Sequence, residues 1–192
     1  MTPFLAGLTL FLGMHSAQAL YPGLRDAAIA RLGARGWKGL YSLVSLAGLW
    51  LLVTGYVAAR PAAEVIWDPP VGLMHLAAGL NLVAIVLLAA SGFPGNAIRA
   101  KLVHPMTLGV KTWAFGHLLA NGDSVSMLLF AAVLVWAVLV FRAARRRPAQ
   151  ASASAPASGW ATLATVLVGG GVGVWFALDG HAWLVGVAAL SR

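Results

Sequence analysis

The chain has 192 residues, of which 60% are hydrophobic and only 9% are charged. Soluble domains carry about 25% charged residues, so this composition excludes an ordinary soluble protein and indicates a chain surrounded by lipid. Because the chain has no cysteine, disulfides, thiolate catalysis and cysteine-ligated metals are excluded. The net charge of +8 could suit a nucleic acid, but the basic residues lie in short connections between apolar stretches, so we expect no nucleic-acid partner.

Apolar stretches near the length that a bilayer core requires, about 20 residues, recur along the chain and predict transmembrane helices. We predict about six spans, at residues 2–20, 39–59, 71–90, 104–122, 125–141 and 160–178. The first lacks a basic leader and a convincing cleavage site, so we interpret it as a retained span. The predicted fold is all-α, a polytopic transmembrane helix bundle that contacts membrane lipid.

The segment after the first span has a different pattern. Residues 24–38 carry four basic side chains, and their apolar residues share one face of a helix. This pattern is typical of an amphipathic helix that lies on the membrane surface.

The fourth span is too polar for an ordinary membrane helix. Pro105 fits its first turn, where the missing N–H is not needed. Asn121 and Gly122 end it, and either Asp123 or Ser124 can cap the helix that follows.

The chain divides into three parts by composition. We predict a five-helix membrane core at residues 1–145 and a flexible Ala/Ser/Pro linker at 146–159. Residues 160–192 would then form a C-terminal transmembrane helix and an interfacial tail. In that helix Gly169 and Gly173 have the GxxxG spacing that lets another helix approach closely.

The basic residues predict the orientation. Ten lie in the connections after the first, third and fifth spans, and two lie on the opposite side: Arg25, Arg31, Arg35, Lys38, Arg99, Lys101, Arg142, Arg145, Arg146 and Arg147, against Arg60 and Arg192. Since basic loops stay in the cytoplasm, both termini should face outward.

Ionisable residues at membrane depth mark a candidate site, because they are costly there. They are His15, His75, His104, Lys111 and His117. A neutral imidazole is a common metal or haem ligand, and two histidines on separate helices can hold one iron. Any one of them could equally donate a hydrogen bond between helices. Lys111 could extend towards the interface or pair with an anion such as a haem propionate.

Two groups of motifs resemble the NnrU family of bacterial inner-membrane proteins. The first is His15-Ser16, then Ala-Arg-Leu-Gly-Ala-Arg-Gly-Trp-Lys-Gly-Leu-Tyr at residues 30–41, then Ser45. The second is His104-Pro-Met with Gly109, followed by Trp113-Ala-Phe-Gly-His117 and Ala120-Asn-Gly122. The resemblance covers about residues 1–145, and the motif at 181–186 adds to it. It implies a link to denitrification and nitric oxide metabolism.

The NnrU family is related to plant zeta-carotene isomerase, which uses a b-type haem to isomerise a polyene double bond. This resemblance implies haem b, with His15 and His117 as its ligands, and an apolar or isoprenoid-like ligand. The alternative cysteine ligand of the isomerase falls on Ala114, so a redox-dependent ligand swap is not available here. The candidates for the surrounding pocket are Ser16, Lys111, Trp113 and Asn121. Trp50 also lies deeper than the tryptophans at the span ends.

A more remote resemblance connects His104-Pro-Met-Thr-Leu-Gly109 with the isoprenylcysteine-type membrane methyltransferases. The arginine of their motif falls on Val103 and its tyrosine on Thr107 or Leu108, and their paired glutamates are missing. This departure implies shared ancestry without binding of S-adenosylmethionine.

Depth gives a different pairing of the histidines. At about 1.5 Å per residue, His15 lies roughly 8 Å from the inner end of its span and His117 about 6 Å from the outer end of its span. Depth alone would pair His15 with His104, and His75 with His117. His104 and His75 are therefore the alternates to the family-based ligands His15 and His117.

Three functions are compatible with the sequence. The first is a haem-binding membrane protein with a redox or isomerase-like role on an apolar substrate. The second is a non-enzymatic protein that serves the assembly or regulation of nitrite and nitric oxide reductases. The third is a diverged membrane methyltransferase. The residues leave open whether the chain is an enzyme.

Overall fold

The structure is a computed structural model that describes residues 1–102, 104–146, 157–186 and 189. In this part of the chain the regular secondary structure is helical, and the one isolated bridge joins Val65 to Asp123. The predicted linker at 146–159 lies largely outside the described residues, as does the end of the predicted interfacial tail. The all-helical prediction is confirmed for the described residues.

The chain forms two compact units. The first contains residues 1–65 and 123–129, and the second contains residues 66–122 and 130–192. Helix α6 (Ser124–Arg146) contributes its first turns to the first unit and the remainder to the second.

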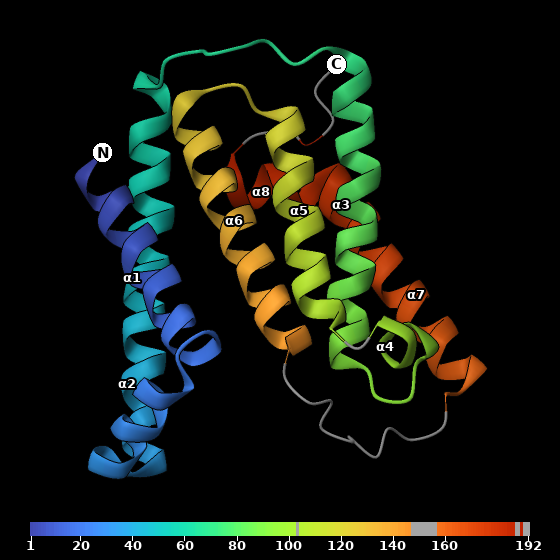
Figure 1. The fold of residues 1–192 in the computed structure, drawn as a ribbon. Helices are drawn as coiled ribbons and strands as arrows, with labels where there is room; N and C mark the ends of the chain where they lie inside the picture. Colours follow the sequence, from blue (N-terminus) through green and yellow to red (C-terminus); the bar gives the residue numbers. More distant parts are fainter. Residues whose placement is uncertain (103, 147–156, 187–188, 190–192) are drawn as a thin grey trace. The chain divides into compact units, whose positions relative to one another are not determined.

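In the first unit, α1 (Thr2–Ala19) packs along α2 (Pro22–Ala59), as Figure 1 shows for the two helices at the blue end of the chain. Glycine allows the two backbones to approach. A Cβ at Gly48 would lie only 2.8 Å from the backbone nitrogen of Phe11. Small residues at such contacts are typical of helix pairs in membranes, where close packing replaces the hydrophobic effect between helices.

Helix α2 is kinked at Gly33, where φ is 73° and ψ is 165°. A residue with a Cβ is strained at this positive φ, so glycine is required. The sequence predicts a surface helix at 24–38 and a separate span from residue 39. In the structure, α2 covers both as two helical parts that meet at a kink at Gly33, earlier than that boundary. The position of the first part on the membrane surface stays a prediction.

In the second unit, α3 (Val71–Gly92) packs against both α5 (Pro105–Ala120) and α7 (Gly159–Trp175). Figure 1 shows α3 and α5 side by side. The short helix α4 (Ala97–Leu102) connects α3 to α5, and a π-helical turn, η2 (Phe176–Gly180), connects α7 to α8 (His181–Val185). The predicted close approach through the GxxxG motif is confirmed: a Cβ would lie 2.9 Å from Val86 Cα at Gly169, and 2.6 Å from Leu82 Cδ1 at Gly173.

The loop at residues 60–70 begins with η1 (Arg60–Ala62) and then runs extended. Several of its backbone groups form hydrogen bonds. In the first unit the Ser124 N–H donates to the Glu64 carbonyl over 2.9 Å, and in the second the Ile66 N–H donates to the Gly122 carbonyl over 2.8 Å. These bonds satisfy backbone groups that the prolines of the loop keep out of a helix.

Four helical segments of the described chain are long and apolar enough to cross a membrane: Pro22–Ala62, Val71–Gly92, Ser124–Arg146 and Gly159–Val185. The six predicted spans are therefore confirmed only in part. Helix α5 has 16 residues, about 24 Å at 1.5 Å per residue, which is short for a hydrocarbon core of roughly 30 Å. Helix α1 carries polar residues in its second half.

Candidate histidine site

His117 lies in the last turn of α5, in the second unit, and its tautomer is defined by one bond. Its Nδ1 donates to the backbone carbonyl of Trp113 over 2.9 Å. A carbonyl oxygen can only accept, so the hydrogen of the neutral ring is on Nδ1 and the lone pair is on Nε2. Metal-binding histidines usually donate the other ring N–H in this way, which fixes the ring for ligation.

Aromatic rings surround the His117 imidazole. The ring centroids of Trp113 and Phe130 lie 4.7 and 4.5 Å from that of His117, and Phe130 meets Trp113 edge-on at 5.2 Å. Trp113 comes from α5 and Phe130 from α6, and Phe130 is only 5% exposed. These rings form an apolar wall that would keep water from the imidazole.

A second histidine, His181, lies against His117. The two ring centroids are 6.4 Å apart with planes 25° from parallel, and Phe176 meets His181 edge-on at 5.6 Å. The sequence predicts an interfacial position for His181 and no part in the site, because the stretch after residue 180 is too short to span. Its motif at 181–186 was the signal that could have placed it in the site.

Asn121 supports the end of α5. Its Nδ2 donates to the His117 backbone carbonyl over 2.9 Å, and its own N–H donates to the same oxygen over 3.0 Å. The structure thus brings together His117, Trp113 and Asn121, three of the predicted site residues. Ala114 is fully buried in the same helix.

His15 lies in α1, in the first unit, and repeats the arrangement of His117. Its Nδ1 donates to the Phe11 carbonyl, four residues earlier, over 2.8 Å. Its ring centroid lies 4.2 Å from that of Phe11 and 5.4 Å from that of Tyr41. The next residue, Ser16, accepts the Leu20 N–H with its backbone carbonyl at the end of α1. Because His15 and His117 belong to different units, their pairing stays a prediction.

The alternates His75 and His104 lie at opposite ends of the α3–α5 pair. A Cβ at Gly116 would meet the Ala77 carbonyl at 3.3 Å, so the beginning of α3 lies beside the end of α5. His75 is therefore at the same end as His117, in agreement with the order expected from depth, but its side chain is exposed. His104 precedes α5, and its ring packs edge-on against Phe141 at 6.3 Å.

Lys111 points towards the later part of α6. Its Nζ lies 4.8 Å from the ring centroid of Phe141, and the guanidinium of Arg145 lies 5.9 Å from the same ring. Cation–π contacts of this kind suit a lysine whose stem crosses apolar surface. This geometry favours the extended conformation for Lys111 and does not place it beside His117. Trp50 is 66% exposed and lines no described pocket.

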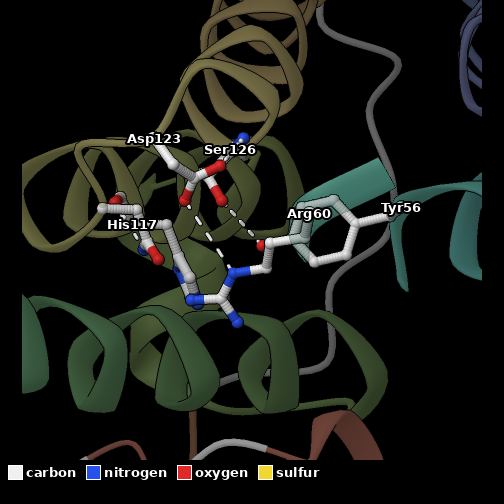
Figure 2. A network of polar contacts seen from close by, with 6 residues as sticks. Tyr56, Arg60, His117, Asp123 and Ser126 are labelled. Atoms are coloured by element: carbon white, nitrogen blue, oxygen red, sulfur yellow. Dashed lines mark hydrogen bonds and ion pairs between the residues drawn. The ribbon is translucent and has the colours of Figure 1, made fainter. Parts of the chain in front are cut away.

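A network of polar contacts in the first unit surrounds the first turn of α6 (Figure 2). Asp123 Oδ1 accepts the Ser126 N–H over 2.8 Å, so Asp123, and not Ser124, is the cap. The other oxygen of Asp123 lies 3.8 Å from Arg60 Nε. The Tyr56 hydroxyl and the fully buried Ser126 hydroxyl are 2.7 Å apart. Nothing in the sequence pattern indicated that Tyr56 and Ser126 would meet.

The donor set suits haem better than a metal ion held by protein ligands alone. Among the described residues no group of three or more histidines and carboxylates could hold an ion. A porphyrin supplies four nitrogens itself and needs only one or two axial imidazoles from the protein. Nδ1-protonated histidines beside aromatic rings meet this need.

A search of curated proteins and a search of solved structures found no match. The family model described as NnrU protein matches residues 3–189. The match includes both groups of motifs, the histidine site and the C-terminal helix. The chain therefore belongs to the NnrU family.

Proposed function

We propose that this NnrU protein binds haem b in the bacterial inner membrane and has a redox or isomerase-like role on an apolar substrate in denitrification or nitric oxide metabolism. The observation that carries the proposal is the shared geometry of His15 and His117. Each donates Nδ1–H to the carbonyl four residues before it, over 2.8 and 2.9 Å. This bond leaves Nε2 as the basic nitrogen of a ring whose orientation is held.

The residues around the two histidines have roles that follow from their contacts. His15 and His117 would supply the axial nitrogens, and the haem would supply the electronic chemistry. Trp113 and Phe130 would limit the access of water to His117, and Asn121 holds the end of its helix. Ala114 has no ligating atom, so it would not take part in holding the haem.

The membrane location is supported by the four span-forming helices and by the excess of basic residues in the connections assigned to the cytoplasm. These observations support an inner-membrane protein with both termini in the periplasm. The apolar surroundings of His117 support an apolar ligand, of the isoprenoid class or similar, as the substrate.

The experiment is an optical spectrum of the full chain, purified in mild detergent with haem supplied during expression. The wild type is compared with His15→Ala and His117→Ala, and with His75→Ala and His104→Ala as matched controls. We expect a Soret band that is lost or strongly reduced in the first two variants and retained in the controls.

A wild type without Soret absorbance would overturn haem binding and leave the assembly role for nitrite and nitric oxide reductases as the better function. Loss of the band in His75→Ala or His104→Ala, with retention in His15→Ala, would reject the proposed ligand pair.

A further inference from the structure

The kink of α2 forms a cationic cavity next to His15, and the two share Tyr41, whose ring centroid lies 5.4 Å from that of His15. The cavity has a volume of about 210 Å³ and is lined by Arg25, Trp37, Lys38, Tyr41 and Ser42. One water takes up about 30 Å³ of liquid, so the space admits a headgroup and not only a single ion. All five residues belong to α2, in the first unit.

The bend at Gly33 brings the lining residues together. In a straight helix Arg25 and Lys38 would be about 20 Å apart along the axis, at 1.5 Å per residue. The backbone at Gly33 turns the first part of α2, and Arg25 lines one cavity together with four residues of the second part: Trp37, Lys38, Tyr41 and Ser42. The cavity therefore depends on the backbone conformation of this glycine.

The lining residues of the cavity suit a ligand that carries an anionic group next to an apolar part. Arg25 and Lys38 supply positive charge, and Tyr41 and Ser42 supply hydroxyl donors. Trp37, only 8% exposed, contributes an apolar floor, and its ring centroid lies 6.1 Å from that of Tyr41. Amphipathic aromatic rings beside basic residues are typical of the level of lipid headgroups.

Little on the chain neutralises this charge. None of the lining residues is acidic, and the whole sequence has only five acidic residues. Arg25 does pair with Asp26 over 3.0 Å, but this pair is exposed and monodentate, and the guanidinium has five N–H donors.

We propose that this cavity binds the phosphate of an anionic phospholipid headgroup of the inner leaflet. The chain enters α2 directly after α1 ends at Ala19, so the cavity lies where a predicted span meets the predicted cytoplasmic surface. Basic pockets beside membrane helices bind anionic headgroups in this position. The proposal does not depend on haem, because His15 and His117 are not among the lining residues.

The test uses the full chain in mild detergent, prepared without added haem, and titrates it by calorimetry with short-chain phosphatidylglycerol. Short-chain phosphatidylcholine and inorganic phosphate are titrated separately. The variants are Arg25→Gln/Lys38→Gln and, as a matched control, Arg31→Gln/Arg35→Gln, which removes the same charge from the same helix outside the cavity lining. Thermal unfolding shows whether each variant is folded.

We expect phosphatidylglycerol to bind at least tenfold more tightly than phosphatidylcholine or inorganic phosphate. The Arg25→Gln/Lys38→Gln variant should lose at least tenfold in affinity, and the control less than threefold. An equal loss in both variants would show general charge attraction and overturn the site. Tighter binding of inorganic phosphate than of the lipid would overturn the lipid as the source of the phosphate.

Discussion

The imidazole of His181 lies over that of His117, with ring centroids 6.4 Å apart and planes 25° from parallel. The two residues are 64 positions apart in the sequence (181 − 117), both within the second unit. Phe176 meets His181 edge-on at 5.6 Å, so both α8 and η2 contribute rings near His117, the proposed haem ligand.

This stacking predicts a supporting role for His181. In His181→Ala, haem affinity should fall severalfold, because the ring packed over His117 is removed while the Nδ1 bond of His117 remains. Titration of apoprotein with haem, followed at the Soret band, measures the change. His117→Ala is the reference for loss of a ligand, and an equally large loss in His181→Ala would mean that His181 ligates.

The contact of α7 with α3 predicts different costs for neighbouring glycines. Gly169→Ile should lower the unfolding midpoint strongly, because even a Cβ there would lie 2.9 Å from Val86 Cα. Gly171→Ile is the control, since a Cβ there meets nothing within 4 Å. Thermal unfolding in detergent compares the two, and equal midpoints would show that α7 does not depend on this contact.

The kink of α2 predicts that Gly33 is specifically required. Gly33→Ala should destabilise the kinked form by about 1–3 kcal/mol, because φ 73° with ψ 165° is a conformation that essentially only glycine adopts. It should also weaken binding of phosphatidylglycerol, because the cavity needs the bend. Gly39→Ala, in the straight part with open space around its Cβ, should retain binding. Retained lipid affinity in Gly33→Ala would contradict the link between bend and cavity.

Because Asp123 caps α6, we expect two substitutions of this residue to lower the stability of the protein by different amounts. Asp123→Ala should destabilise the protein by about 1 kcal/mol, the usual value of an N-cap. Asp123→Asn keeps an oxygen for the Ser126 N–H and should cost much less, since the 3.8 Å contact with Arg60 is long for an ion pair. Chemical denaturation of both variants measures the difference; equal losses would assign the energy to the charge.

Local signals in the sequence were sufficient to predict most helix ends. Pro105 marks the start of α5, and the Asn121-Gly122 pair marks its end. The same holds for α3, whose start at Val71 follows two prolines. These boundaries depend on backbone chemistry within a few residues, which the sequence displays directly.

The kink and the neighbours of His117 could not be predicted in the same way. Gly33 lies inside a continuous amphipathic pattern, which is compatible with a straight helix as well as with a bent one. The contact between His117 and His181 depends on how α7, η2 and α8 return past α5, and no local pattern fixes such a path. The pairing of His15 with His117 depends on the motif resemblance alone.

The hydrogen bonds from Nδ1 of His15 and His117 each join the ring to a backbone carbonyl one turn earlier in the same helix. The plane of each imidazole is therefore fixed to the axis of α1 or α5 and does not swing independently. Any rotation of either helix, caused by a ligand or a partner, would turn the imidazole plane by the same angle. A haem held by these two residues, as proposed, would make such a rotation measurable, because its spectrum would respond to the orientation of the imidazoles that hold it.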